Sequence, residues 1–195
     1  HAAAMKHVHI AEYNPDECIK TNINGARNVI NASLESSVSR VVALSTDKAA
    51  APINLYGATK LVSDKLFVSA NNIKGKKDIK FSVVRYGNVM ASNGSVIPIF
   101  IKQIKEGSAV TITHKMMSRF IMPLSQAAEL VLESLAVGFA GEIYIIKMPA
   151  LMIEDLADAL IEILSPNPKN ISKEYVGLRP GEKMYEELLS EEEFE

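Results

Sequence analysis

The 195-residue sequence has one cysteine, almost no net charge and no long apolar run. The lone Cys18 cannot form an intramolecular disulfide, and no CxxC or Cys/His cluster has the spacing of a zinc site, so no metal centre is predicted. The 21 Lys and Arg nearly balance the 23 Asp and Glu, giving a net charge of −2. This balance excludes a nucleic-acid binder that depends on displacing phosphate counterions.

Membrane and secretion signals are also missing. No apolar run approaches the roughly 18 residues that span a bilayer, and the first nine residues, HAAAMKHVH, lack the basic and apolar regions of a signal peptide. We therefore expect a soluble protein of a reducing cytoplasm, with no nucleic-acid partner and no membrane span.

A glycine-rich turn is a further absence. A doubly wound nucleotide-binding sheet normally opens with a strand, a glycine-rich turn and a helix that receives the pyrophosphate, yet neither GxGxxG nor GxxGxxG occurs here. Residues 1–4 instead resemble the end of a strand in the middle of such a sheet. We therefore expect that an opening half of about 60–90 residues is missing.

What remains alternates between helix-like and strand-like stretches, which predicts an α/β fold with a mostly parallel sheet. Apolar residues at helical spacing predict helices over residues 16–36, 56–72, 99–106, 124–137, 153–164 and 184–189. Short apolar runs predict strands over residues 38–45, 81–86, 110–113 and 142–146, with loops over 88–98 and 176–183. The expected fold is a Rossmann-like doubly wound sheet without its glycine-rich half, followed by a smaller C-terminal substrate-binding region. Residues 1–87 would hold the rest of the coenzyme-binding domain, and residues 88–195 mainly the substrate-binding region, interleaved with it.

Tyr56 and Lys60 stand four residues apart on a predicted helix and so project from the same face. A tyrosine with the ordinary pKa of about 10 is a poor base, and lowering that pKa by about 3 units requires about 4 kcal/mol. A partly buried ammonium a few ångströms away supplies energy of that order. A surface tyrosine above a solvated lysine has the same spacing, so the motif alone leaves both readings open. Its context favours a site, because Ser45–Lys48 end a predicted buried strand, where open α/β sheets bind ligands.

These motifs resemble the extended short-chain dehydrogenase/reductase family. Ser45-Thr46-Asp47-Lys48 followed by PINLYGATK, residues 52–60, is similar to its inverting UDP-N-acetylglucosamine 4,6-dehydratases. Related membrane-associated dehydratases carry Met at position 56, and dTDP-glucose dehydratases carry Asp-Glu at 47 and 48. The resemblance continues through residues 2–8, 12–15, 21–25, 85–89, 92–98, 118–120 and 179–183. It departs at Ala51, where the family has Asn, and at His114-Lys115, where it has Asp-Pro.

The resemblance implies an NADP-dependent hydro-lyase, with NAD as the alternative coenzyme. Tyr56, assisted by Lys60, would take the proton of the sugar 4-hydroxyl, and Thr46 would hydrogen-bond the 4-oxygen. Lys48 would remove the proton on carbon 5, and Asp47 would protonate the departing 6-hydroxyl. Carbon 5 would be inverted, giving a UDP-4-keto-6-deoxy-L-sugar for pseudaminic acid, flagellin glycosylation or another surface glycan.

This chemistry makes a physical demand on Asp47 and Lys48, because both must be uncharged near neutral pH. An exposed pair stabilises the charges of both partners, whereas desolvation in a closed cleft favours the neutral forms. The alternative interpretation is a surface ion pair.

The resemblance also implies binding contacts. The coenzyme contacts would be Ala2, Ala3, Asn22, Ser45, Tyr56, Lys60 and Val89. The substrate contacts would be Lys6, Asn88, Asn93, Gly94, Ser95, Val96, Arg119, Arg179 and Glu182. The two arginines suit a diphosphate, because a guanidinium offers a bidentate fork.

We expect a homo-oligomer that acts on a UDP-sugar, although this stretch alone would bind NADP poorly. Two other functions fit the same sequence. A 4-epimerase or reductase of the family needs Tyr56 and Lys60 but has no use for Asp47 and Lys48. A truncated, non-catalytic binding or assembly module needs none of them.

Overall fold

The computed structural model describes residues 1–92 and 94–193, which divide into two compact units. The first unit consists of residues 1–86, 125–147 and the described residues from 187 onward. The second consists of residues 87–124, apart from Asn93, and 148–186. Within the described ranges, no helix has both the length and the apolar composition needed to cross a membrane.

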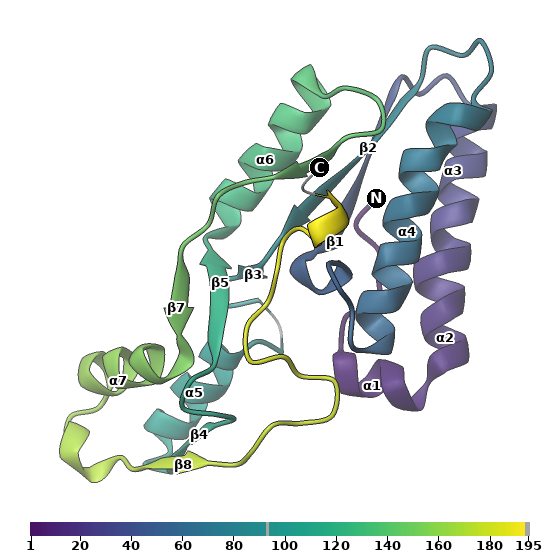
Figure 1. The fold of residues 1–195 in the computed structure, drawn as a ribbon. Helices are drawn as coiled ribbons and strands as arrows, with labels where there is room; N and C mark the ends of the chain where they lie inside the picture. Colours follow the sequence, from purple (N-terminus) through teal and green to yellow (C-terminus); the bar gives the residue numbers. More distant parts are fainter. Residues whose placement is uncertain (93, 194–195) are drawn as a thin grey trace. The chain divides into compact units, whose positions relative to one another are not determined.

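The described part of the first unit is built on a three-stranded parallel sheet with the order β1-β2-β6 (Figure 1). The strands are β1 (Arg40–Thr46), β2 (Lys80–Tyr86) and β6 (Ile143–Ile145). The register places Ser45 beside Arg85 and Thr46 beside Tyr86 at the carboxyl ends of β1 and β2. On the outer edge of β1, the His1 amino group donates to the Val42 carbonyl and the His1 carbonyl accepts from Leu44 N.

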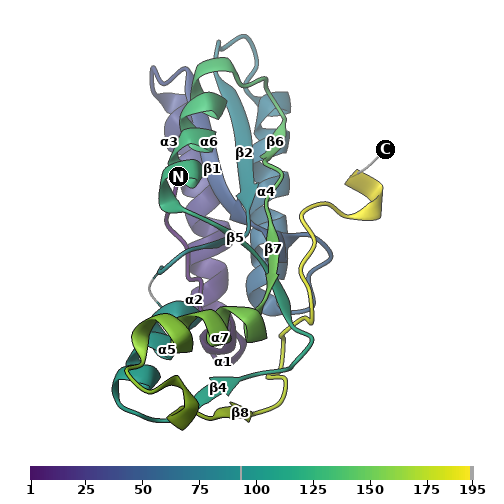
Figure 2. The same ribbon diagram turned by 90° about the vertical axis from the view of Figure 1, so that its left-hand side faces the viewer.

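Helices cover both faces of this sheet (Figures 1 and 2). The helical segments of the first unit are α1 (Val8–Tyr13), α2 (Pro15–Ile19), a π-helix (Lys20–Asn24), α3 (Gly25–Glu35), the 3-10 helix η2 (Asp47–Ala49), α4 (Leu55–Ile73), α6 (Leu124–Val137) and the 3-10 helix η4 (Glu191–Glu193), of which α3 and α4 pack on one face of the sheet and α6 on the other.

Successive side chains of β1 point to opposite faces of the sheet, and both faces are buried. One core joins β1 and β2 to α3 and α4 through Ala26, Ile30, Val41, Ala43, Phe67, Ala70, Phe81 and Val83. The other joins the same strands to α6 through Val42, Val84 and Leu130. Burial on both sides explains the continuous apolar run in β1. The predicted Rossmann-like parallel α/β fold is confirmed.

The second unit contains short strands and two longer helices. Its elements are β3 (Asn88–Val89), α5 (Val96–Lys105), β4 (Val110–Ile112), β5 (Ser118–Met122), β7 (Ala150–Met152), α7 (Ile153–Leu164), the 3-10 helix η3 (Pro168–Asn170) and β8 (Lys173–Tyr175). Strand β5 pairs with β3 in parallel and with β7 antiparallel, and β4 pairs with β8 in parallel. Its core lies between α5, α7 and β4, around the fully buried Phe100, Val110, Ile112 and Ala157.

Several predicted elements need correction. The predicted helix over 16–36 is interrupted by the π-helix, and the predicted helix over 184–189 is wrong, because these residues form bends and irregular chain. Strand β3 lies in a predicted loop, and β5, β7 and β8 were not predicted. They are two to five residues long, too short for an alternating pattern to stand out.

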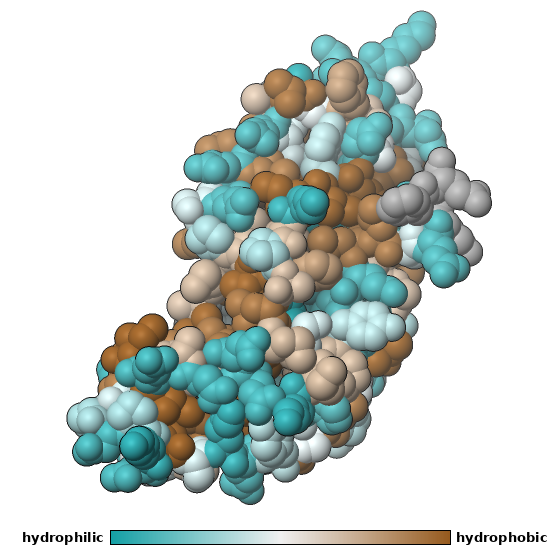
Figure 3. Space-filling view, turned by 60° about the vertical axis from the view of Figure 1, so that its left-hand side comes forward, coloured by the Kyte–Doolittle hydropathy of each residue, from teal (hydrophilic) through white to brown (hydrophobic). Residues whose placement is uncertain are grey.

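The surface carries scattered apolar side chains as well as polar ones (Figure 3). On α6 and the turn after it, Leu132, Val137 and Phe139 are each at least 65% exposed.

Candidate active site

The carboxyl end of β1 brings Thr46, Asp47 and Lys48 together. Thr46 caps η2 by accepting a hydrogen bond from Lys48 N at 3.4 Å, and its hydroxyl also bonds Asp47 Oδ1 at 2.8 Å. Lys48 Nζ donates to the same Oδ1 at 3.0 Å. The Asp47 side chain is 0% exposed and that of Lys48 only 20% exposed. A surface ion pair is therefore excluded, although the charge state of the pair stays a prediction.

One carboxylate oxygen of Asp47 is left over from these contacts. Asp47 Oδ2 is buried and has no hydrogen-bond partner among the described residues. A buried carboxyl oxygen without a partner is costly. Asp47 Oδ2 is therefore the atom of the Asp47–Lys48 pair best placed to form a hydrogen bond with a bound ligand.

Helix α4 begins close to this turn because of a glycine. Asn54 caps the helix by accepting a hydrogen bond from Gly57 N at 2.7 Å. A Cβ at Gly57 would collide with the carbonyl oxygen of Lys48 and crowd Pro52. Only glycine at position 57 lets the backbone of α4 pack this closely against the backbone of Lys48. The first turns of α4, which carry Tyr56 and Lys60, therefore lie next to the Asp47–Lys48 turn.

Tyr56 and Lys60 are both buried, at 8% and 3% exposure. Lys60 Nζ donates to the Leu44 carbonyl of β1 at 2.7 Å. Burial lowers the pKa of Lys60, whereas the charge of Asp64 acts to raise it. These positions exclude the surface reading of the motif.

The pKa of Tyr56 is raised rather than lowered. Burial is the largest cause, a hydrogen bond with the Thr46 side chain acts in the opposite direction, and the charge of Asp47 adds to the increase. The expectation of an activated phenol is thus wrong for the chain by itself, because the loss of water disfavours the phenolate. A positive charge brought close to the phenol would be needed to reverse this direction.

Asn22 ties the chain entering the site to α4. Its Oδ1 accepts from Met5 N at 2.8 Å, and its Nδ2 donates to Met5 O at 3.1 Å and to Thr59 Oγ1 at 3.0 Å. The π-helix around Asn22 contains an i to i+5 turn, a local geometry often found at functional sites. Asn22 therefore holds the backbone at Met5 against α4, and its contact with a coenzyme stays a prediction.

A buried charged group behind the site was not predicted. Ser45 Oγ donates to Asp64 Oδ2 at 2.8 Å, and Arg85 Nη2 donates to the same oxygen at 3.1 Å. Arg85 also donates to Glu193 Oε2 at 2.7 Å and to Leu188 O at 2.9 Å. Ser45, expected to contact a coenzyme, is thus engaged with Asp64. The sequence does contain a sign of this group, because Asp64 stands four residues after Lys60, on the apolar face of α4.

The residues of the first unit fit a nicotinamide coenzyme. Ala2 and Ala3 are exposed and small, so a ligand can approach their backbone closely. The Lys60 ammonium carries three N–H groups, and the bond to Leu44 O is the one it makes among the described residues. Its other donors suit the hydroxyls of a ribose. Lys6 is exposed.

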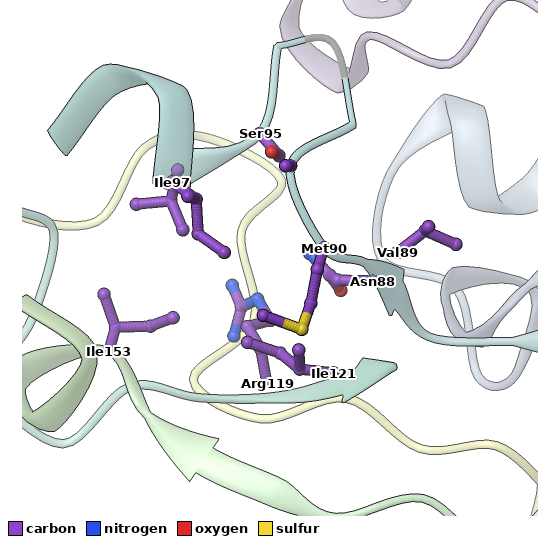
Figure 4. Close-up of a pocket in the computed structure, with 10 residues that line it drawn as sticks. Asn88, Val89, Met90, Ser95, Ile97, Arg119, Ile121 and Ile153 are labelled. Atoms are coloured by element: carbon purple, nitrogen blue, oxygen red, sulfur yellow. The ribbon is translucent and has the colours of Figure 1, made fainter. Parts of the chain in front are cut away.

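The second unit holds a pocket of about 270 Å³ that gathers five of the predicted contacts (Figure 4). It is lined by Asn88, Val89, Met90, Ala91, Ser95, Val96, Ile97, Arg119, Ile121 and Ile153. The guanidinium of Arg119 lies between Met90 and the side chains of Ile97 and Ile153 in Figure 4. Its Nη1 is held by the carbonyls of Ser118 at 2.7 Å and Met184 at 3.3 Å.

Two buried polar atoms of this pocket have no hydrogen-bond partner among the described residues. Asn88 Oδ1 and Ser95 Oγ are buried and make no hydrogen bond within the described ranges. Together with the cationic Arg119 they provide an acceptor, a hydroxyl and a guanidinium among apolar walls. This combination suits a ligand with a negative charge and a flat or apolar part.

Other predicted substrate contacts lie outside the pocket. Arg179 and Glu182 form a turn of their own, in which Arg179 N donates to Glu182 Oε2 and Glu182 N to Arg179 O, both at 3.1 Å. Gly94 is exposed and adopts a left-handed conformation with φ of 74°. Asn93 lies outside the described residues.

The sequence as a whole matches a known protein family. A family described as "Polysaccharide biosynthesis protein" matches residues 1–195. The chain belongs to this family. The relatives also confirm the predicted resemblance to the UDP-N-acetylglucosamine 4,6-dehydratases.

Two curated relatives and one solved structure are similar to this chain. The inverting UDP-N-acetylglucosamine 4,6-dehydratase of Campylobacter jejuni is 53% identical over 99% of this chain and 56% of the relative. A protein of Rickettsia conorii named UDP-glucose 4-epimerase is 46% identical over 99% of this chain and 56% of the relative. The X-ray structure of Pen from Bacillus thuringiensis is 48% identical, has a TM-score of 0.92, and is matched over 96% of this chain and 58% of its own. The chain thus spans little more than half the length of these relatives.

Proposed function

We propose that the complete protein is an NADP-dependent, configuration-inverting UDP-N-acetylglucosamine 4,6-dehydratase, and that this chain carries its catalytic residues. The observation that carries the proposal is the buried Asp47–Lys48 pair at the end of β1, next to the helix that bears Tyr56 and Lys60. The resemblance to this enzyme in both motifs and the identity to the Campylobacter jejuni dehydratase support it.

The residues of the first unit would divide the reaction between them. Tyr56 takes the proton of the 4-hydroxyl, with Lys60 beside it, and Thr46 orients the 4-oxygen. Once carbon 4 is a ketone, the hydrogen on carbon 5 is acidic, and Lys48 removes it while Asp47 protonates the leaving 6-hydroxyl, so that water departs. Carbon 5 is then reprotonated on the opposite face by a proton that exchanges with solvent. A bound nicotinamide coenzyme supplies the hydride acceptor for carbon 4 and the hydride donor for carbon 6.

The hydrogen bonds of the turn fit these roles. Asp47 must hold a proton, and its partner-free Oδ2 is the oxygen that can pass that proton to a substrate hydroxyl. Lys48 must be neutral to act as a base, and its contact with Asp47 allows a shared proton between the two groups. Removal of water from the site on substrate binding favours both uncharged forms.

The pocket of the second unit would hold the nucleotide. Arg119 would bind the diphosphate, because a guanidinium pairs two phosphate oxygens at once. Asn88, Ser95 and Val96 line the same pocket and would contact the rest of the nucleotide. Arg179 and Glu182 stay candidates for phosphate and ribose contacts, as do Lys6, Asn93 and Gly94 for the sugar nucleotide.

The product would be a UDP-4-keto-6-deoxy-L-sugar. Membership of the polysaccharide biosynthesis family supports a role in making a surface glycan, of which pseudaminic acid on flagellin is the specific case proposed. The enzyme would act as a homo-oligomer.

A 4-epimerase is the second candidate, favoured by the Rickettsia conorii relative that carries that name. An epimerase uses the redox chemistry of Tyr56 and Lys60 and returns the hydride to carbon 4. In an epimerase, the Asp47–Lys48 pair would have no role in the reaction.

The deciding experiment supplies UDP-N-acetylglucosamine and NADP to the complete gene product and follows the sugar by proton NMR in D₂O. A dehydratase gives a 4-keto-6-deoxy product with deuterium on carbon 5 and inverted configuration there. Formation of the 4-epimer with the 6-hydroxyl retained would establish the epimerase instead.

The Lys48→Ala variant then tests the assignment of the base. Dehydration should fall by at least about a thousandfold, within the range that general base catalysis contributes, while NADP binding is kept. Lys65→Ala, on the exposed side of α4, is the matched control. Undiminished dehydration by Lys48→Ala would remove Lys48 from the mechanism.

A further inference from the structure

Asp64 lies one helical turn beyond Lys60 on α4. Tyr56, Lys60 and Asp64 follow each other at intervals of four residues, and all three are buried, with Asp64 at 1% exposure. Residues four apart on a helix are neighbours, with Cβ atoms about 6 Å apart. Asp64 is thus the carboxylate of α4 next to the buried ammonium of Lys60.

The two oxygens of Asp64 have different surroundings. Oδ2 accepts hydrogen bonds from Ser45 and Arg85, whereas Oδ1 is buried and has no hydrogen-bond partner in the described part of the chain. A buried carboxylate with one unshared oxygen exerts its charge on nearby groups with little screening by water. Lys60 feels this charge, since Asp64 raises its pKa against the effect of burial.

Arg85 keeps this carboxylate in place. It comes from the strand position paired with Ser45, is 0% exposed, and reaches Asp64 from β2. Burial raises the pKa of Asp64, and the Ser45 hydrogen bond and the charges of Arg85 and Lys60 act against that increase. Glu193 provides a second carboxylate for Arg85, at 2.7 Å and 3.1 Å, so the guanidinium is shared between two anions.

We propose that Asp64 is a positioning residue of the Tyr56–Lys60 pair, which holds Lys60 in its ammonium form inside the buried site. Without a counter-charge, burial would drive Lys60 to lose its proton, and the cation that assists Tyr56 would be gone. Ser45 and Arg85 fix the Asp64 carboxylate, so the charge acts from one position. The catalytic consequence rests on the proposed function, whereas the charge state of Lys60 does not.

Other ionisable groups lie on α4, on the elements packed against it, or in contact with Arg85. They are the His1 amino group on the edge of β1, Asp47 and Lys48 of η2, Tyr56 of α4, Arg85 and Tyr86 of β2, and Glu193 of η4. Of these, the His1 amino group is repelled by Lys60. The test therefore compares variants that change one charge at a time.

The test is a titration of the complete gene product labelled with ¹³C-lysine, with the Lys60 signal assigned by its loss in Lys60→Arg. Asp64→Asn keeps the shape of the side chain and removes its charge. The midpoint of the Lys60 titration should move to lower pH by about one unit or more, the effect of losing one opposite charge at this range. Asp64→Glu should recover most of the shift, and Asp78→Asn, at an exposed position, should leave the midpoint in place.

The same variants report on catalysis. In Asp64→Asn, the alkaline limb of the pH–rate profile for UDP-N-acetylglucosamine dehydration should move to lower pH with the Lys60 midpoint. A purely structural role would lower kcat without moving the limb, and such a result would overturn the proposal. A moved Lys60 midpoint in a protein that turns over no UDP-N-acetylglucosamine would support the inference and refute the proposed function.

A second measurement needs no substitution. The ¹³Cγ signal of Asp64 in the unchanged protein should show an ionised carboxylate at pH 7. An unshifted Lys60 midpoint in folded Asp64→Asn, or a protonated Asp64 at pH 7, would overturn the proposal.

Discussion

The carbonyl oxygen of Lys48 occupies the space that a side chain on Gly57 would need. This contact joins the turn that carries the proposed acid and base to α4, the helix that carries Tyr56. The distance between the turn and the helix therefore depends on Gly57 having no Cβ.

We expect Gly57→Ala to push the start of α4 away from this turn. Overpacking of this kind lowers the free energy of unfolding by about 1–3 kcal/mol, and a displacement of about 1 Å at a reacting group costs roughly a hundredfold in rate. Urea unfolding and initial rates of dehydration measure the two effects in the complete gene product. Gly25→Ala is the matched control, because its Cβ would meet only Lys20 O at an ordinary 3.7 Å. Equal behaviour of the two variants would show that the close approach is unimportant.

Ala51 adopts a left-handed conformation, with φ of 41°, between η2 and α4. This conformation costs an L-residue about 1–2 kcal/mol, whereas Asn tolerates it. Asn is also the residue that the resemblance leads one to expect here. Ala51→Asn should therefore raise the free energy of unfolding by about 0.5–1 kcal/mol. Ala136→Asn, the same change on the exposed side of α6, should lower stability through its poorer helix propensity. A loss of stability in Ala51→Asn would contradict the assignment of strain.

Lys60 connects stability to pH. Because burial lowers its pKa in the folded state, the buried ammonium destabilises the fold below the folded-state pKa, and this cost disappears as the pH rises to the ordinary value near 10.5. Lys60→Met removes the titration. The unfolding free energy of the unchanged protein should therefore rise relative to Lys60→Met between pH 7 and pH 10, as measured by urea unfolding at each pH. Lys65→Met, on the exposed side of α4, controls for loss of a lysine. A constant difference across this range would be inconsistent with a buried ammonium.

Arg119 is held by backbone carbonyls at the pocket of the second unit. If it binds a diphosphate, Arg119→Met should weaken UDP binding roughly 10- to 100-fold, the value of one or two hydrogen bonds to a charged group. Isothermal titration calorimetry with UDP measures this directly. Lys102→Met, whose side chain is 75% exposed on α5, should bind UDP like the unchanged protein. Equal affinities for Arg119→Met and the unchanged protein would place the diphosphate elsewhere.

Local patterns predicted the frame of the first unit well. The apolar run of β1, the polar residues after it and the Tyr56–Lys60 spacing are properties of short stretches, and the structure places them as expected. The buried Asp47–Lys48 turn follows from the same logic, because a strand end buried on both faces leaves little water near it.

Long-range contacts were beyond the reach of such patterns. The bond between Asp64 and Arg85 depends on the register of β1 against β2, and the bond to Glu193 spans 108 residues. The prediction that the pKa of Tyr56 is lowered was wrong for a related reason. Spacing along a helix shows that a lysine is near, but it does not show how much water the fold removes. Arg179 and Glu182 pair in a turn of their own, which no periodicity reveals.

The π-helix at Lys20–Asn24 also limits how this protein can change. Each residue of an α-helix turns the next by about 100°, so deleting one residue there would restore a regular helix and swing the Asn22 amide away from Met5 and Thr59. Such a deletion would break the hydrogen bonds by which Asn22 joins the chain at Met5 to α4. A chimera of two homologous proteins that is joined within this helix will therefore keep the hydrogen bonds of Asn22 only when both parents have the π-helix.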